Sequence, residues 1–193
     1  MRKVILLLNV SLDGIADHTV TIADDELHTF ATKLINHLDA ILFGRTTYQL
    51  FQDFWPTAPE NPELPESMLA FAQKINTIPK IVFSRTLSEV NWNNTRLVKR
   101  YMVEEVLRMK RQPGSDIGIF GSLNTATMLI NQGLVDDFWL LVHPVILGKG
   151  ERMFDGLHNK HNLKLADTQT FNSGVVVLHY QTVQNKIIKT QTR

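Results

Sequence analysis

The first two thirds of the chain alternate short apolar runs with segments of helical periodicity. Val4 to Leu8 is a continuous apolar run that ends at a polar turn, as in a strand buried on both faces. Beyond it, apolar residues recur at helical spacing up to Leu38, which predicts an amphipathic helix capped by Asp24 or Asp25. Ala40 to Phe43 follow at once and predict the next strand. This repeating unit is typical of a parallel α/β sheet.

The alternation continues through the middle of the chain. Trp55 to Pro65 contains four prolines and predicts a loop. Gly133 is placed to end a helix that begins after Gly121 and Ser122. The other elements predicted here are helices over residues 66–75 and from about residue 103, and strands over residues 80–83 and 117–120.

Strand-like segments dominate the last third. Val135 to Val142 and Val175 to Gln181 are two long β segments, separated by a loop from Gly148 to about Leu163. We therefore predict a single α/β domain over residues 1–184, with a mostly parallel central sheet finished by antiparallel C-terminal strands. A polar tail is expected over residues 185–193.

The composition argues against several classes of protein. Lys and Arg number 20 against 19 acidic residues, so the formal net charge of +1 gives no overall attraction to nucleic acid or to an anionic membrane. The absence of cysteine excludes disulfides and cysteine-ligated zinc, and the seven histidines show no metal-ligand spacing. The apolar run from Val4 to Leu8 is too short to cross a bilayer. We expect a cytoplasmic protein with no metal.

Polar residues follow several of the predicted strands, and in open α/β sheets ligands bind beyond the carboxyl ends of strands. Glycine lets backbone amides approach a ligand, hydroxyls donate hydrogen bonds, and arginine pairs with phosphate oxygens. The strand ends concerned are Asn9 to Gly14, Gly44 to Thr47, Ser84 to Thr86 and Gly121 to Asn124. Three of the four share this chemistry and together predict a site for a polyanionic ligand.

Each of these strand ends also has a simpler interpretation. A glycine at a strand-to-helix junction commonly serves only the turn, and Arg45 or Arg85 alone is commonly a surface ion pair. Other nucleotide motifs do not fit, because no G-x-G-x-x-G follows the first strand and the glycines around Lys149 lack the spacing of a P-loop. There is no G-x-S-x-G elbow for a hydrolase. The coincidence of three strand ends is what supports the hypothesis.

Five blocks of sequence also resemble a known family. They are SLDG at residues 11–14, DAILFGRTTY at 39–48, KIVFSRTL at 80–87, IGIFGS at 117–122 and GLVDDFWLLVHPVILGKGERMF at 133–154. In content and spacing they are similar to the dihydrofolate reductase-like superfamily. The closest likeness is to the reductase domain at the C-terminus of the riboflavin-biosynthesis deaminase-reductase and its stand-alone bacterial relatives. The resemblance runs nearly end to end and implies the three-layer fold of that superfamily.

The resemblance implies that the chain binds NADP(H) at the same strand ends. In the family the G-R-x-T-Y block grips phosphates of NADPH, the next Ser-Arg pair approaches the adenosine 2′-phosphate, and the G-S block holds the pyrophosphate. The nicotinamide is expected against the end of the first strand. The cofactor-binding residues implied in this way are Gly44, Arg45, Thr46, Thr47, Ser84, Arg85, Gly121, Ser122, Leu123 and Val10.

The substrate is expected on the other side of the first strand end, beside the helix that starts near Asp24. Dihydrofolate reductases carry an acidic residue on that helix that supports protonation of the substrate ring, which makes Asp25 and Asp24 the candidate catalytic residues. An acidic residue in a first helical turn also serves simply as a partner of the helix dipole. The residues expected around the substrate are Asn9, Asp13, Tyr48 and Trp55, although Tyr48 and Trp55 are equally typical of core or rim packing. His143, which precedes Pro144, is assigned a structural role.

Taken together, the residues and the resemblance predict an NADPH-dependent reductase. It would transfer hydride to a flat pterin-like or pyrimidine-like heterocycle, and the protein would chiefly position cofactor and substrate. The alternative is a non-catalytic NADP-binding or dimeric scaffold protein that has kept the fold. Relatives commonly pair, and the long C-terminal strands are candidates for an interface, so a homodimer is expected.

Overall fold

A computed structural model describes residues 1–183, so the polar tail predicted over residues 185–193 lies outside the described residues. The helices are α1 (Asp25–Ile35), α2 (Arg45–Gln52), α3 (Glu66–Thr77), α4 (Met102–Arg111) and α5 (Leu123–Asn131), with short 3-10 helices η1 (His18–Val20) and η2 (Ala58–Glu60). The strands are β1 (Val4–Ser11), β2 (Leu38–Gly44), β3 (Lys80–Phe83), β4 (Thr95–Val98), β5 (Asp116–Phe120), β6 (Asp137–His143), β7 (Leu163–Thr170) and β8 (Val176–Thr182). No helix in this described part is long and apolar enough to cross a membrane.

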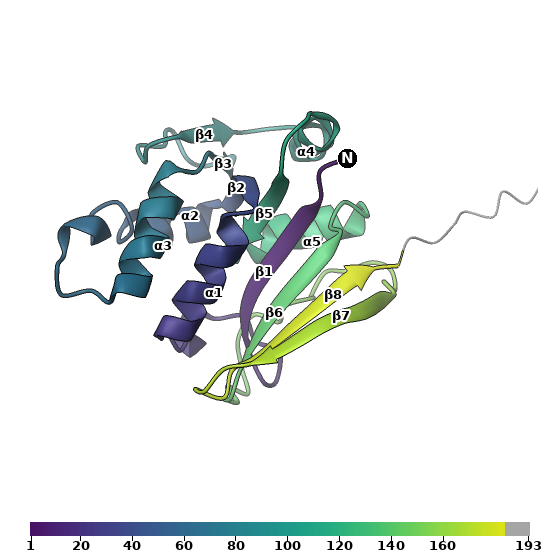
Figure 1. Cartoon of the computed structure of the whole chain (residues 1–193). Coiled ribbons are helices and arrows are strands. Elements are labelled where there is room, and N and C mark those ends of the chain that lie inside the picture. Colours follow the sequence, from purple (N-terminus) through teal and green to yellow (C-terminus); the bar gives the residue numbers. More distant parts are fainter. Residues whose placement is uncertain (184–193) are drawn as a thin grey trace, which may run out of the picture.

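All eight strands form one sheet in the order β4-β3-β2-β5-β1-β6-β8-β7 (Figure 1). From β4 through β6 every neighbouring pair is parallel, whereas β8 is antiparallel to both β6 and β7. This confirms the predicted fold class, a mostly parallel sheet with antiparallel C-terminal strands. Because the parallel strands share a direction, their carboxyl ends lie along one edge of the sheet.

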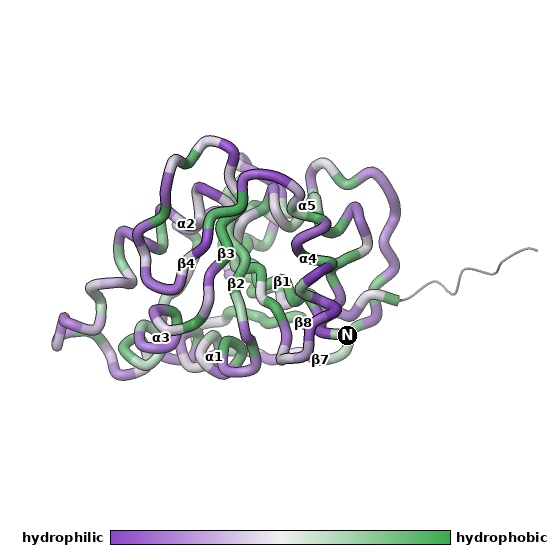
Figure 2. Tube along the Cα trace, turned by 90° about the horizontal axis from the view of Figure 1, so that it is seen from above, coloured by the Kyte–Doolittle hydropathy of each residue, from purple (hydrophilic) through white to green (hydrophobic). Residues whose placement is uncertain are grey.

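Helices cover the two faces of the sheet, which places apolar strands in the middle layer (Figure 2). Leu6 and Leu8 of β1 pack with residues of α4 and α5 in one core, and Ile5 and Leu7 pack with residues of α1 and α3 in the other. Side chains of a strand alternate between faces, so a strand buried on both must be apolar throughout. That requirement explains the unbroken apolar run at the start of the chain.

Two polar side chains fix the ends of helices on the α1 and α3 face. The carboxylate of Asp24 accepts a hydrogen bond of 2.8 Å from the backbone N–H of Leu27, which caps α1. At the far end of α3, the ammonium of Lys80 donates to three backbone carbonyls and lies over the Trp92 ring. Lys80 is only 1% exposed. Its charge compensates the negative end of the helix dipole.

Two strands were missed from sequence, and both lie at the edges of the sheet. The asparagine-rich segment after β3 contains β4, and the residues after the predicted loop form β7. Nearly every residue of β7 is exposed, so its sequence LKLADTQT shows no sustained apolar alternation. An edge strand is held by backbone hydrogen bonds to one neighbour, and that pairing leaves little trace in the side-chain pattern.

Candidate functional site at the carboxyl edge

The carboxyl ends of β2 and β5 are joined by hydrogen bonds between the predicted phosphate-binding segments. The backbone N–H of Gly44 donates to Ser122 Oγ at 2.9 Å, and the N–H of Ser122 donates to Thr47 Oγ1 at 3.0 Å. β2 and β5 are neighbours in the sheet, so segments 75 to 78 residues apart in sequence meet directly. The structure therefore brings together two of the three strand ends chosen from sequence.

The two helices that begin here have no side-chain cap. The N-terminal boundary of α2 is Gly44 and that of α5 is Ser122, and neither boundary residue caps its helix with its own side chain. Helix N-termini carry unpaired N–H groups and the positive end of the dipole, which favour an anion. Ser122 is also left-handed, with φ 56°, directly after Gly121 at φ 57°. Such backbone strain in a non-glycine residue is typical of binding and catalytic segments.

The N–H groups of the glycines themselves are already used. The N–H of Gly121 donates to the carbonyl of Leu7 at 3.0 Å, and those of Gly44 and Ser122 make the bonds described above. In this structure the N–H groups of these residues join the strand ends and are not free to donate to a ligand. The donors left without an intrahelical acceptor are the first-turn N–H groups of α2, from Arg45, and of α5, from Leu123.

Two arginines add positive charge to this edge. Arg45 is exposed and its Nη1 lies 3.2 Å from Gln49 Oε1, while Arg85 is exposed directly after β3. Within residues 1–183, neither guanidinium forms an ion pair with a carboxylate. Ser84 Oγ accepts hydrogen bonds from the N–H groups of Thr86 and Leu87, which fixes the turn that carries Arg85. The residues present therefore fit the phosphate groups of a dinucleotide.

At the end of β1, a buried histidine orients Asn9. The Nδ1 of His143 accepts a hydrogen bond of 3.2 Å from the N–H of Ile22, so its proton lies on Nε2, which is 3.0 Å from Asn9 Oδ1. His143 is fully buried, and burial lowers its pKa, although the nearby carboxylate of Asp24 raises it in part. With its oxygen engaged, Asn9 keeps its NH₂ group as a hydrogen-bond donor. Sequence reasoning gave His143 only a structural role and no link to Asn9.

Asp13 binds the backbone of a distant loop. Its carboxylate accepts hydrogen bonds from Ser11 Oγ at 2.7 Å and from the N–H groups of Leu147 and Gly148 at 3.1 and 2.8 Å. The hydrogen bond from Ser11, followed by those from Gly148 and Leu147, lowers the pKa of Asp13 to about 2. Asp13 thus connects the end of β1 to the loop after β6. The sequence-based hypothesis had instead placed Asp13 beside the substrate.

Replacing Asp13 with asparagine is expected to lower the melting temperature by a few degrees at neutral pH, because two backbone N–H donors lose a charged acceptor. The folded-state pKa lies below the unfolded value of 3.8, so this contribution is present above pH 4 and is lost as the pH falls toward 2. Thermal melts of both proteins from pH 6 to pH 2.5 should converge. A difference that persists unchanged at pH 2.5 would contradict the assignment.

The two acidic residues proposed for catalysis both have partners in the protein. Burial raises the pKa of Asp24, but the hydrogen bond from Leu27 N–H and further donors outweigh it, so the pKa stays below its usual value. Asp24 is therefore an ionised helix cap that cannot supply a proton near neutral pH. Asp25 accepts a hydrogen bond from Ser67 Oγ and links α1 to α3. Asp24 therefore lacks the raised pKa of a general acid.

The two aromatic residues expected near the substrate differ in position. Tyr48 is 1% exposed, and its hydroxyl accepts hydrogen bonds from the N–H groups of Asn91 and Trp92, which places it in the core away from any ligand. Trp55 is half-buried, with its ring 4.7 Å from that of Phe71 and edge-on to it. Val10 is 1% exposed and can meet a ligand only through its backbone.

The mostly parallel sheet defines an α/β protein, and within residues 1–183 its carboxyl edge carries two helix N-termini and two arginines without ion pairs, a candidate anion site. Residues 2–177 match the RibD C-terminal domain, and the chain belongs to that family. It is 35% identical over 184 residues to the uncharacterized protein YyaP of Bacillus subtilis (strain 168), covering 93% of this chain and 94% of YyaP.

Solved structures show the same fold. A protein from Shewanella sp. PV-4, named for riboflavin biosynthesis, superposes with a TM-score of 0.72 at 18% identity, over 94% of this chain and 99% of that one. The diaminohydroxyphosphoribosylaminopyrimidine deaminase/5-amino-6-(5-phosphoribosylamino)uracil reductase of Thermotoga maritima gives a TM-score of 0.65 at 16% identity. That match covers 94% of this chain and 57% of the Thermotoga protein. The predicted resemblance to a RibD-type reductase domain is thereby confirmed.

Proposed function

We propose that the protein is an NADPH-dependent reductase that transfers hydride to a flat, pyrimidine-like or pterin-like heterocycle. The observation that carries the proposal is the pair of uncapped helix N-termini, joined through Gly44, Ser122 and Thr47 and adjoined by Arg45 and Arg85. Membership of a reductase-domain family supports it.

In this proposal the side chains bind and orient, and the chemistry comes from the cofactor. NADPH supplies the hydride. The first-turn N–H groups of α2 and α5 and the guanidinium of Arg45 would hold its phosphates. Arg85, next to the strand end of β3, would pair with the 2′-phosphate. Asn9, held by His143, would donate a hydrogen bond to an acceptor atom of the heterocycle.

The proposal is tested by titrating the purified protein with NADPH while following nicotinamide fluorescence. Saturable binding, followed by NADPH oxidation when dihydrofolate or an aminopyrimidine is added, is the expected result. Binding without turnover on any such acceptor would favour the non-catalytic alternative. No binding at millimolar NADPH would refute both the proposed cofactor and the proposed reductase activity.

Replacing Arg85 with glutamine should weaken NADPH binding by about tenfold and leave NADH binding within about twofold, since only NADPH carries a 2′-phosphate. The ratio of the two dissociation constants is the measurement. Arg100→Gln is the matched control, because Arg100 is an exposed arginine after the neighbouring strand β4. If Arg100→Gln weakened NADPH binding equally, the effect would come from the lower positive charge of the protein surface and not from a contact between Arg85 and the 2′-phosphate.

The substrate side gives an independent prediction. Asn9→Asp keeps an acceptor for His143 but replaces the NH₂ donors with a carboxylate oxygen. It should raise the KM for the heterocycle by about tenfold, with the dissociation constant for NADPH unchanged. Asn93→Asp, an exposed asparagine before β4, is the control. If Asn9→Asp weakened NADPH binding as well, Asn9 would belong to the cofactor site.

A further inference from the structure

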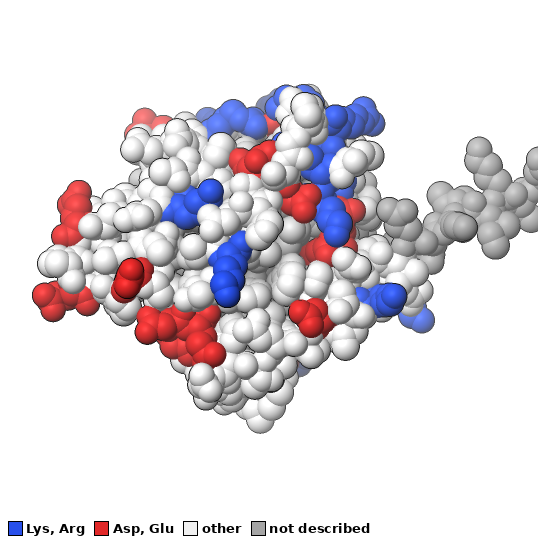
Figure 3. All heavy atoms as spheres, in the orientation of Figure 1, with Lys and Arg blue, Asp and Glu red and all other residues white. Residues whose placement is uncertain are grey.

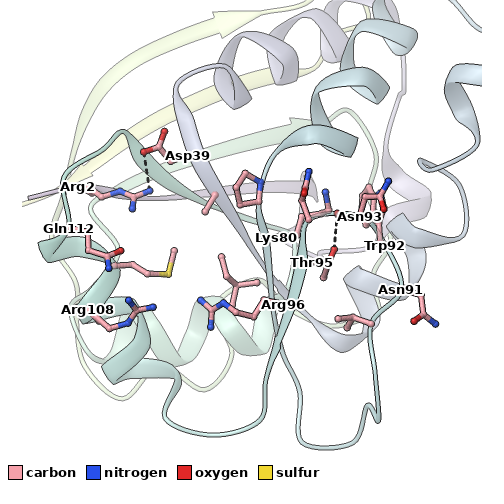
Figure 4. A pocket seen from close by; sticks show the side chains of 16 residues that line it. Arg2, Asp39, Lys80, Asn91, Trp92, Asn93, Thr95, Arg96, Arg108 and Gln112 are labelled. Carbon is pink, nitrogen blue, oxygen red and sulfur yellow. Dashed lines mark hydrogen bonds and ion pairs between the residues drawn. The ribbon is translucent and has the colours of Figure 1, made fainter.

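A hollow lies at the amino-terminal edge of the sheet, opposite the candidate site. Its volume is about 550 Å³, within the range of pockets that take small molecules. It is formed by the starts of β2, β3 and β4, the loop before β4 and the end of α4 (Figure 4). The strand β3 separates it from Ser84, so a distance of about 10 Å lies between this hollow and the carboxyl edge. It is therefore distinct from the proposed cofactor site.

The hollow carries an excess of positive charge. Four cations line it, namely Arg2, Lys80, Arg96 and Arg108, and the carboxylates at or beside it are those of Asp39 and Glu105. Two positive charges are left over here, whereas the whole chain has a net charge of +1. In Figure 3, blue Lys and Arg side chains gather near α4 and the start of the chain, while acidic ones gather near α1 and α3.

One carboxylate brings two of these arginines together. Glu105 accepts hydrogen bonds from Arg108 Nε at 3.1 Å and Arg108 Nη2 at 2.7 Å, and from Arg96 Nη2. The hydrogen bonds from Arg108 and Arg96 keep the pKa of Glu105 below its usual value, so the carboxylate stays ionised. Two guanidiniums from β4 and α4 thus point toward one another across the hollow, with donors remaining on each (Figure 4). Such paired forks match the oxygens of a phosphate.

Arg2 supplies a buried guanidinium whose Nη2 has an ion-pair partner but no hydrogen bond. Its side chain is 8% exposed, and its Nη2 is buried without a hydrogen bond to any residue of the described chain. Nη2 forms an ion pair of 3.5 Å with Asp39 Oδ2, an oxygen that also accepts a hydrogen bond of 2.6 Å from the N–H of Ser115. The Asp39 carboxylate is shared with Ser115, so the Arg2 guanidinium keeps charge that favours an anion in the hollow. Lys80 contributes charge alone, because its three protons are already donated to carbonyls.

From these observations we infer that the hollow between β3, β4 and α4 binds a small phosphate-bearing ligand through Arg2, Arg96 and Arg108. The rim is fixed in advance, because the hydroxyl of Tyr48 accepts hydrogen bonds from the loop before β4. Met109 and Ile81 give the hollow an apolar wall for the remainder of such a ligand. This site is independent of the reductase activity proposed above.

The experiment is a calorimetric titration of the full chain with inorganic pyrophosphate at low salt. Arg96→Gln and Arg108→Gln should each weaken binding by about tenfold, the effect of losing one charge-assisted contact. Glu105→Gln should strengthen binding by a similar factor, because it removes the negative charge that competes with the ligand for both guanidiniums. Lys164→Gln, which removes one charge from β7 at the far edge of the sheet, should change binding by less than twofold.

The opposite signs separate a ligand contact from loss of folding, since an unfolded variant cannot bind more tightly. Absence of binding to the unmodified protein at millimolar pyrophosphate would overturn the inference. So would binding that Arg45→Gln abolishes while Arg96→Gln and Arg108→Gln leave it intact, because the anion would then occupy the carboxyl edge. NADPH titrations of the same variants report on the reductase proposal separately.

Discussion

Replacing Lys80 with methionine is expected to lower the free energy of unfolding by about 3 kcal/mol, because buried hydrogen-bond acceptors lose their donor. The ammonium lies 2.9, 3.2 and 2.9 Å from the carbonyls of Ile75, Asn76 and Ile78. Its nitrogen is also 4.4 Å from the centre of the Trp92 ring. Methionine fills similar space but leaves the end of α3 unpaired. Urea unfolding followed by circular dichroism measures the difference.

Lys74→Met is the matched control. It makes the same change of side chain in the last turn of α3, the helix whose end Lys80 contacts. Lys74 is only half-buried and donates no side-chain hydrogen bond within the described residues, so its replacement should cost less than about 0.5 kcal/mol. A loss below about 1 kcal/mol for Lys80→Met would show that water replaces the ammonium at these carbonyls.

The pH dependence of the same pair of proteins gives a further check. Burial lowers the pKa of Lys80 from 10.5 to about 8, so between these values the unfolded chain binds the proton more tightly than the folded chain. The stability of the unmodified protein relative to Lys80→Met should therefore rise as the pH increases from 8 to 10.5. A fall over this window would mean that the carbonyls hold the pKa high.

The central elements were predicted well from the sequence because buried strands and helices carry a regular pattern of apolar side chains. The predicted strand over residues 80–83 and the capped helix after Asp24 agree with β3 and α1. β7 could not be predicted, because its residues face solvent and its pairing with β8 uses the backbone. Lys80 is a buried residue whose environment could not be predicted from the sequence. A lysine in a short strand gives no sign that it will be buried against carbonyls of the preceding helix.

The candidate site shows the same division. Glycines, hydroxyls and arginines at strand ends pointed to the carboxyl edge, and the structure joins two of those ends. Which amides remain free could not be predicted, since it depends on bonds such as Gly44 to Ser122 that exist only once β2 and β5 are neighbours. His143 was missed for a related reason. Its orienting role depends on Ile22, 121 residues earlier, and nothing local distinguishes it from a packed core histidine.

Gly121→Ala is expected to weaken NADPH binding by about thirtyfold, the largest effect we predict on the proposed activity. Gly121 has φ 57°, so any side chain there is strained, and an added Cβ would lie 3.3 Å from Cγ2 of Thr47. Thr47 is the residue whose hydroxyl accepts the N–H of Ser122. Moving it would disturb both uncapped helix ends at once. Fluorescence titration with NADPH gives the dissociation constant.

Gly133→Ala separates strain from crowding. Gly133 also has a left-handed backbone, with φ 64°, but an added Cβ there would meet nothing within 4 Å. It follows the C-terminal end of α5, whereas Gly121 lies just before that helix begins. Both variants should lose about 1 kcal/mol of stability from the backbone conformation. Only Gly121→Ala should lose affinity for NADPH, because only there does the new methyl group displace a residue that couples the two strand ends. Equal losses of affinity would mean that the cofactor site depends on overall stability and not on this junction.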